Sequence, residues 1–139
     1  MKQFQDFKII ETDYSGAVKY VHVAHHEGKI GFRNTANTVW FISVSPKNNF
    51  AGMAAVFFVT PEKARIKSVY VRPDFRGRGL GLWLTDYVTE WAVDNGAEEI
   101  TVLAKVPDFY KKLGWQVSSI RSNGGAKMTW KPPTGKEKD

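Results

Sequence analysis

The 139-residue sequence contains no cysteine. Without thiolates the chain cannot form disulfides, iron–sulfur clusters, zinc–thiolate sites or a thiol nucleophile. It also lacks an apolar run near the roughly 20 residues of a membrane-spanning helix, and its first residues, MKQFQDFKII, lack the apolar core of a signal peptide. There is no internal repeat. These absences predict a soluble, cytoplasmic protein without a membrane partner.

The length is that of one domain. A chain of this size buries about two thirds of its unfolded surface and needs no cross-links. Hydrophobic residues make up 42% and charged residues 24%, which is ordinary globular composition. We therefore expect a single domain over residues 1–131 and a flexible, proline- and charge-rich tail at 132–139.

The formal net charge of +6 is unevenly distributed. Residues 61–80 carry six basic and two acidic side chains, residues 81–110 one basic and six acidic, and residues 111–139 seven basic and two acidic. A basic balance favours anionic partners such as nucleic acid, an acidic protein, an anionic membrane or a phosphorylated cofactor. Composition does not distinguish among them.

Hydrophobic periodicity predicts a mixed α/β sheet with helices on its faces. Strands are expected at residues 4–12, 38–44, 50–59, 64–71, 99–104, 115–121 and 126–130, and helices at 14–27, 80–94 and 107–113. The strands between 38 and 71 would form an antiparallel meander, and residues 122–125 a hairpin turn.

Two of these elements carry more detailed predictions. Alternation in the strand at 64–71 places Ile66, Ser68 and Tyr70 on one face and Val69 and Val71 on the other. The first helix is expected to stop at Gly28. The second helix is expected to bury the residues at helical spacing, which are Leu80, Trp83, Leu84, Tyr87, Val88 and Trp91.

The segment RGRGLG, residues 76–81, joins the strand at 64–71 to the second helix. A helix N-terminus offers unpaired N–H groups and the positive end of a dipole, and glycines let an anion approach the backbone closely. With the guanidinium groups of Arg76 and Arg78, this favours a diphosphate cradle, although a flexible basic turn fits the same residues. A nucleotide P-loop fits poorly because no Gly-Lys-Ser/Thr follows.

The stretch VYVRPDFRGRGLGLWL resembles the acyl-CoA-binding signature of the GNAT family of N-acetyltransferases, Arg/Gln-x-x-Gly-x-Gly/Ala, through Arg76, Gly79 and Gly81. Downstream, DFYKKLGW at 108–115 resembles the second signature of the family, (F/Y)-Y-x-x-x-G-(F/W). The resemblance covers about residues 50–130. It implies a GNAT-like α/β (α+β) fold, with a mixed, mostly antiparallel sheet of six to seven strands, helices on both faces and a V-shaped splay between the central strands.

The resemblance implies acetyl-CoA as co-substrate. Backbone amides would hold its pyrophosphate, at Arg76, Gly77, Arg78, Gly79, Leu80, Gly81 and Leu82. The pantetheine arm would lie like an added strand between the segments Val69–Val71 and Val102–Ala104. A backbone N–H between Val69 and Val71 would stabilise the oxyanion.

The resemblance also implies direct attack of the acceptor amine on the thioester. Tyr110 occupies the position where the family usually keeps a tyrosine near the departing thiolate, which a phenol can protonate. Many relatives carry a glutamate base in the strand before the cradle, near the position of Arg65 here. The base is thus open: either the acceptor arrives deprotonated, or water held by the backbone and Ser68 relays the proton.

The three histidines, His22, His25 and His26, share one side of the first predicted helix. A solvated helix end explains this spacing better than a metal site, since no recognised zinc motif accompanies it, and we predict no metal. The corresponding region of the GNAT family usually borders the acceptor. The resemblance therefore implies His25 or His26 as an acceptor-side base.

We predict an N-acetyltransferase (EC 2.3.1.-) that acts on a primary amine of a protein, a small molecule or a nucleic acid. The basic balance favours an anionic acceptor over a polycation, which like charges repel. Two alternatives stay open: a nucleic-acid-binding module that uses the basic segments, and a GNAT domain that binds acyl-CoA without turnover. The chain would act as a monomer or a homodimer.

Overall fold

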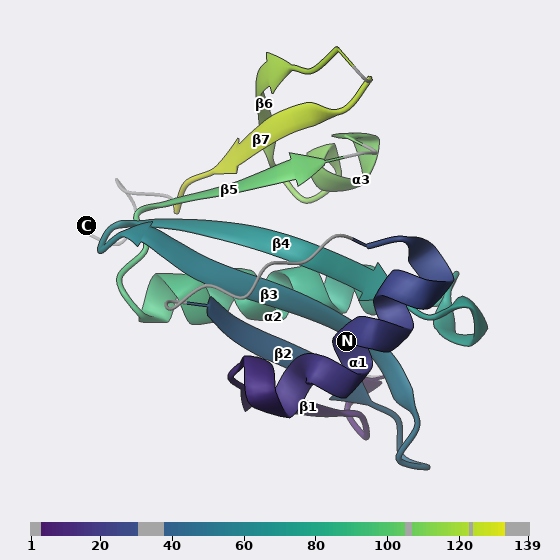
Figure 1. Ribbon diagram of the computed structural model, residues 1–139. Coiled ribbons are helices and arrows are strands. Elements are labelled where there is room, and N and C mark those ends of the chain that lie inside the picture. The colour runs from purple at the N-terminus through teal and green to yellow at the C-terminus, as the bar shows by residue number, and fades with distance from the viewer. Residues whose placement is uncertain (1–3, 31–37, 105–106, 123, 133–139) are drawn as a thin grey trace.

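The computed structural model describes residues 4–30, 38–104, 107–122 and 124–132. Within these residues, one sheet of seven strands is accompanied by three α-helices (Figure 1). The elements are β1 (Lys8–Thr12), α1 (Tyr14–Gly28), β2 (Thr38–Val44), β3 (Phe50–Thr60), β4 (Lys63–Val71), the 3-10 helix η2 (Pro73–Phe75), α2 (Leu80–Asp94), β5 (Glu99–Ala104), α3 (Pro107–Lys111), β6 (Gln116–Ile120) and β7 (Ala126–Trp130). The expected tail at 132–139 lies outside the described residues from position 133 onward.

The strand order is β1-β2-β3-β4-β5-β7-β6. Strands β1 to β4 form an antiparallel meander, and β5, β7 and β6 are also antiparallel to their neighbours. The central pair, β4 and β5, is parallel and joined only over Lys63–Ile66 and Glu99–Val102. Beyond this short ladder the two strands diverge (Figure 1). The predicted mixed, mostly antiparallel sheet with a central splay is therefore confirmed.

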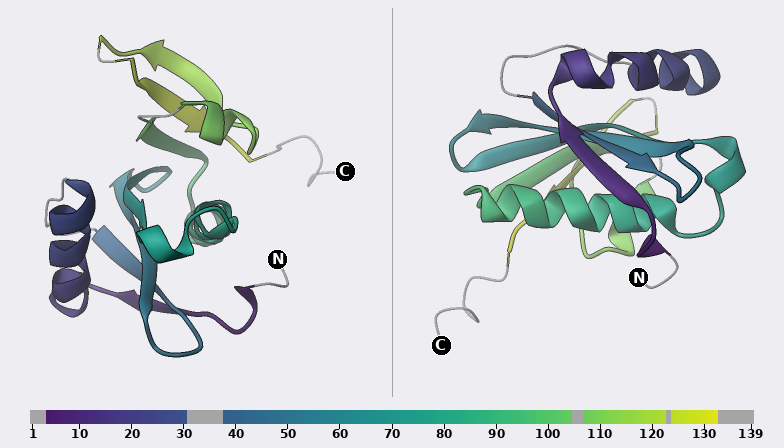
Figure 2. Two further views of the ribbon diagram at one scale, coloured as in Figure 1. Left: turned by 90° about the vertical axis from the view of Figure 1, so that its right-hand side faces the viewer. Right: turned by 90° about the horizontal axis from the view of Figure 1, so that it is seen from below.

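The two long helices cover opposite faces of the sheet (Figure 2). Helix α1 buries Ala17, Val21 and Ala24 against β2 and β3, whereas α2 buries Val88 and Ala92 on the other face. In Figure 1, α1 lies in front of the meander, and no described helix covers the same face of β5 and β7. None of the described helices combines the length and the apolar character that crossing a bilayer requires.

Helix α2 buries a different stripe from the predicted one. Its buried residues are Leu80, Leu84, Thr85, Val88, Thr89 and Ala92. The hydroxyl of Thr85 donates to the carbonyl of Gly81 at 2.8 Å and that of Thr89 to the carbonyl of Thr85 at 2.7 Å. These bonds inside the helix let threonine enter the core. Tyr87 remains 39% exposed, so its predicted burial is wrong.

A β-bulge interrupts β4 at Ser68. The register around it pairs Met53 with Tyr70 and Ala55 with Lys67. Ala54 therefore stands opposite both Ser68 and Val69, and Ser68 takes a φ of +56°, which is uncommon for a residue with a side chain. The extra residue reverses the alternation, so that Ile66 enters the core under α2 and Tyr70 the core under α1. The predicted common face of Ile66, Ser68 and Tyr70 is wrong for this reason.

Helix α1 ends against the ring of Tyr70. The predicted stop, Gly28, is the last helical residue, and Lys29 takes the left-handed conformation with φ 55°. A Cβ on Gly28 would lie 2.5 Å from Cε1 of Tyr70. Glycine is therefore required here by the close approach of this buried ring.

We expect Gly28→Ala to destabilise the protein by about 1–3 kcal/mol, the usual cost of overpacking. Helix propensity alone predicts the opposite sign, because alanine is favoured over glycine by about 1 kcal/mol within a helix. Urea denaturation measures the difference. The exposed residue His26 in the same turn gives the control, His26→Ala, which should have little effect. A gain in stability for Gly28→Ala would contradict the close contact.

Candidate functional site

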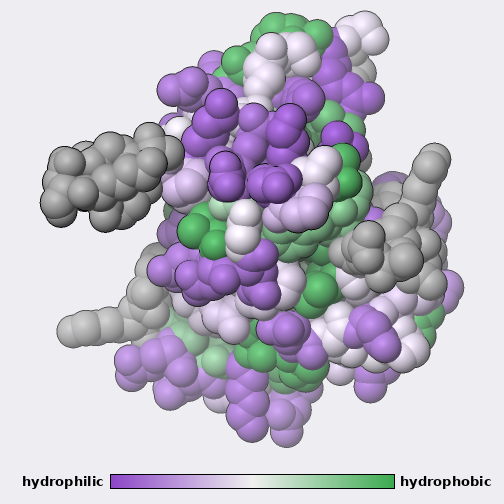
Figure 3. All heavy atoms as spheres, turned by 90° about the vertical axis from the view of Figure 1, so that its left-hand side faces the viewer, coloured by the Kyte–Doolittle hydropathy of each residue, from purple (hydrophilic) through white to green (hydrophobic). Residues whose placement is uncertain are grey.

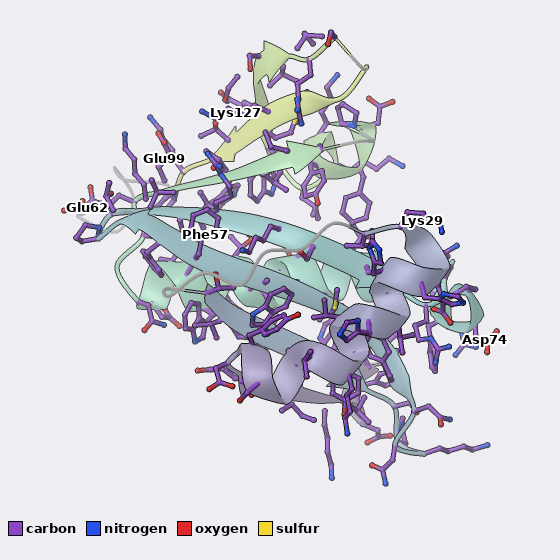
Figure 4. All side chains as sticks on the ribbon, viewed as in Figure 1. Lys29, Phe57, Glu62, Asp74, Glu99 and Lys127 are labelled. Atoms are coloured by element: carbon purple, nitrogen blue, oxygen red, sulfur yellow. The ribbon has the colours of Figure 1, made fainter. Side chains whose placement is uncertain are left out.

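A cavity of about 700 Å³ opens where β4 and β5 diverge. In Figure 4, Glu62 and Glu99 mark the closed end of the splay, and Lys29 lies toward its open end. The lining residues are Ile30, Arg65, Ile66, Lys67, Ser68, Val69, Tyr70, Val71, Arg76, Gly81, Val102, Leu103, Ala104, Phe109 and Tyr110. They come mainly from β4, β5 and α3, with one glycine from the start of α2.

The inner edge of β4 is free of its neighbour along the cavity. The ladder to β5 ends at Ile66 and Val102, whereas β4 continues to Val71 and passes through the bulge at Ser68. Among the described residues, no strand pairs with the edge of β4 that faces β5 beyond Ile66. An extended ligand with amide groups can pair with such an edge as an added strand does. The segment Val69–Val71, predicted to contact the cofactor, lines the cavity.

The glycine-rich segment forms the turn into α2. Gly77 and Gly79 have φ values of +78° and +87°, which residues with a side chain rarely adopt. Gly79 is the N-cap residue of α2, and no side chain caps the helix there. The first N–H groups of α2 are thus not used by a side-chain cap, and the positive end of the helix dipole lies beside the cavity.

Two guanidinium groups flank this turn. Nε of Arg76 donates to the carbonyl of Val71 at 2.9 Å, and its guanidinium carbon lies 5.6 Å from the ring centroid of Tyr70. Nη2 of Arg78 donates to the carbonyl of Asp74 at 3.2 Å. Arg76 lines the cavity together with Gly81. The other predicted cradle residues, Gly77, Arg78, Gly79, Leu80 and Leu82, are adjacent in the chain but not part of the lining.

Tyr110 of α3 lies in the cavity wall with only 7% of its surface exposed. Its ring packs edge-on against Phe109 and Trp115, at centroid distances of 5.0 and 5.5 Å. Burial raises the pKa of Tyr110 to about 12, because the phenolate would lose its hydration. No residue in the described ranges hydrogen-bonds its hydroxyl. At neutral pH the side chain is therefore a neutral phenol that retains its proton.

Glu27, Tyr70 and Arg72 form a polar cluster that links α1 to the end of β4 and that was not predicted from the sequence. The hydroxyl of Tyr70 donates to Oε1 of Glu27 at 2.9 Å, and Arg72 forms an ion pair with the same carboxylate. The hydrogen bond from Arg72 is the main reason that the pKa of Glu27 is lowered. Glu27 is consequently a weak base. No local signal identifies this cluster, because Glu27 is more than 40 residues away from Tyr70 and Arg72 in the chain.

The predicted acceptor-side histidines lie outside the cavity. Both are exposed near the end of α1, and Nδ1 of His25 lies 3.1 Å from the carbonyl oxygen of Ile30. Ile30 lines the cavity, whereas His25 and His26 do not. The geometry therefore adds no support for either histidine as a base. Among the described residues of the lining there is also no aspartate, glutamate or histidine.

Comparisons with known proteins agree with this arrangement. The family model described as "Acetyltransferase (GNAT) family" matches residues 6–115. An uncharacterized N-acetyltransferase of Chlorobaculum tepidum is 29% identical over 76 residues, which cover 55% of this chain and 49% of that protein. One of Methanocaldococcus jannaschii is 34% identical over 64 residues, covering 42% and 28%. The matches thus span half or less of these relatives.

A solved structure shares the fold over most of the chain. Rv2747 from Mycobacterium tuberculosis, crystallised with CoA, superimposes with a TM-score of 0.74 at 15% identity. The alignment covers 91% of this chain and 99% of that one. At this level of identity the similarity establishes the fold.

Proposed function

Because this chain belongs to the GNAT acetyltransferase family, as its two sequence signatures predicted, we propose that it transfers an acetyl group from acetyl-CoA to a primary amine. One observation carries the proposal: a free strand edge, an uncapped helix N-terminus and a buried neutral tyrosine meet at one cavity. Each of these features would interact with a different part of acetyl-CoA.

The cradle and the splay together fit the cofactor. The N–H groups of residues 77–82 would receive the pyrophosphate, since the N–H of Arg76 donates to the carbonyl of Pro73. The helix dipole and the guanidinium of Arg76 favour this electrostatically. The pantetheine amides would pair with the free edge of β4 between Val69 and Val71. The thioester would then lie between the bulge of β4 and Tyr110.

The reaction needs one proton to leave and another to arrive. The amine attacks the thioester carbonyl, and a backbone N–H near Val69 stabilises the oxyanion that forms. When the C–S bond breaks, Tyr110 would give its proton to the thiolate, and the phenolate would then regain a proton from water. The excess proton of the amine leaves through water, held by the backbone and by the hydroxyl of Ser68, since the described lining contains no carboxylate or imidazole.

Calorimetric titration with acetyl-CoA, with CoA as the reference ligand, tests the proposal directly. We expect dissociation constants in the micromolar range for both. Release of free thiol from acetyl-CoA in the presence of a panel of amines then measures turnover. Absence of binding for both ligands would refute the enzyme assignment and favour titration with nucleic acid across salt concentrations.

The pH profile of the reaction is a separate prediction. We expect kcat/KM to rise with pH as the acceptor amine loses its proton. No alkaline decline in kcat/KM is expected at any pH up to about 10. The reason is that the pKa of Tyr110 is raised to about 12, so that the proton-donating form persists below that value. Initial rates at saturating acetyl-CoA from pH 6 to about 10 test this. An alkaline loss near pH 8–9 that disappears in Tyr110→Phe would contradict it.

A further inference from the structure

The cavity has a second cationic end that the cofactor phosphates do not explain. Arg65 and Lys67 line it from the part of β4 that precedes the bulge. Arg76 lines it from the other end, beside Val71. At the rise of a β-strand, the six steps from Arg65 to Val71 span roughly 20 Å. A diphosphate bound at Arg76 therefore does not reach Arg65 and Lys67.

These two cations converge on one ring. The guanidinium carbon of Arg65 lies 5.7 Å from the ring centroid of Phe57, and Nζ of Lys67 lies 4.9 Å from it. Phe57 is the register partner of Arg65 on β3. In Figure 4, Phe57 lies close to the closed end of the splay. The ring thus holds two positive charges together on one side of the cavity.

Arg65 has no carboxylate partner among the described residues. Its Nε is 3.5 Å from Oγ1 of Thr101, a distance at the limit of a hydrogen bond. The described lining contributes no acidic side chain at all. A half-buried guanidinium in such a place is best satisfied by an anion that accepts two parallel N–H bonds, as a carboxylate or a phosphate does.

On the basis of the proposed function, we infer that the acceptor is a small amine that carries a carboxylate or phosphate group, which Arg65 and Lys67 bind. Positive charge near the nucleophile also favours its neutral, reactive form. This helps to explain how the amine can react beside a cavity wall without a carboxylate base. The same charges repel polycationic amines. On the side of the molecule at which β4 begins, hydrophilic side chains are mixed with hydrophobic ones (Figure 3).

Matched acceptor pairs test the inference. Lysine and cadaverine differ by one carboxylate, and O-phosphoethanolamine and ethanolamine differ by one phosphate. In one of the two pairs, we expect the wild-type kcat/KM to be at least about tenfold higher for the amine that carries the carboxylate or phosphate than for its partner without it. The pair that shows the preference identifies which of the two anions is bound.

The variant Arg65→Gln/Lys67→Gln should remove this preference, mainly by raising KM for the anionic acceptor. The dissociation constant for CoA and the rate with the non-anionic amine should stay within about threefold. Lys63→Gln is the matched control, since Lys63 is an exposed cation on the same strand outside the cavity lining. It should retain the preference.

The outcomes separate this inference from the proposed function. Failure of acetyl-CoA to bind would refute the proposed function itself. Binding of acetyl-CoA with equal rates within both pairs, or with no turnover of any of the four amines, would overturn the acceptor assignment alone. A parallel loss for both members of a pair in the double variant would also overturn it, because a merely structural role has that effect.

Discussion

Replacing Gly79 with glutamate is expected to raise the dissociation constant for CoA about 100-fold, which corresponds to about 2.7 kcal/mol. Gly79 is the N-cap of α2 and has a φ of +87°, so any side chain strains the turn that presents the helix N–H groups. Glutamate also places a negative charge where the pyrophosphate would bind. Calorimetric titration of the purified variant with CoA measures the effect.

The hairpin between β6 and β7 supplies a control for this variant. Gly124 has the same φ of +87°, and a Cβ there would meet no atom within 4 Å. Gly124→Glu therefore introduces the same backbone strain and the same charge far from the cradle. It should bind CoA as the wild type does. If Gly79→Glu is folded, as judged by circular dichroism, and still binds CoA normally, the glycine-rich turn is not the phosphate site.

Elements with a strong local pattern could be predicted from the sequence. The predicted strands at 38–44 and 99–104 coincide with β2 and β5, because each is a short apolar run with β-branched residues. The predicted helix at 80–94 coincides with α2, whose last turn is followed by Asn95-Gly96, a pair that favours a helix end. The glycine-rich turn could be identified from the sequence because its residues are consecutive in the chain.

Features that depend on pairing between distant segments could not be predicted. The bulge at Ser68 exists only in the register of β4 against β3, and nothing in the sequence ARIKSVYV interrupts its alternation. The meeting of Arg65 and Lys67 over Phe57 depends on the same register. These details shape the end of the cavity that is proposed to bind the acceptor, so that proposal required the structure.

Tyr110→Phe is expected to lower kcat about 10²- to 10³-fold, the usual contribution of a positioned general acid. The dissociation constant for CoA should change little, because the variant keeps the ring that packs against Phe109 and Trp115. Stability should also be preserved, since no residue in the described part of the chain hydrogen-bonds the hydroxyl. Thiol-release rates at saturating acetyl-CoA and acceptor, with calorimetric titration in parallel, separate these effects.

Tyr87→Phe is the matched control, because Tyr87 lies on the exposed side of α2 and does not line the cavity. It should leave both kcat and CoA affinity unchanged. A normal kcat for Tyr110→Phe would remove the phenol from the chemistry and leave water as the source of the proton. A rise in the dissociation constant for CoA with kcat unchanged would assign Tyr110 to cofactor binding instead. Only a selective loss of kcat agrees with a buried phenol that delivers its proton to the departing thiolate.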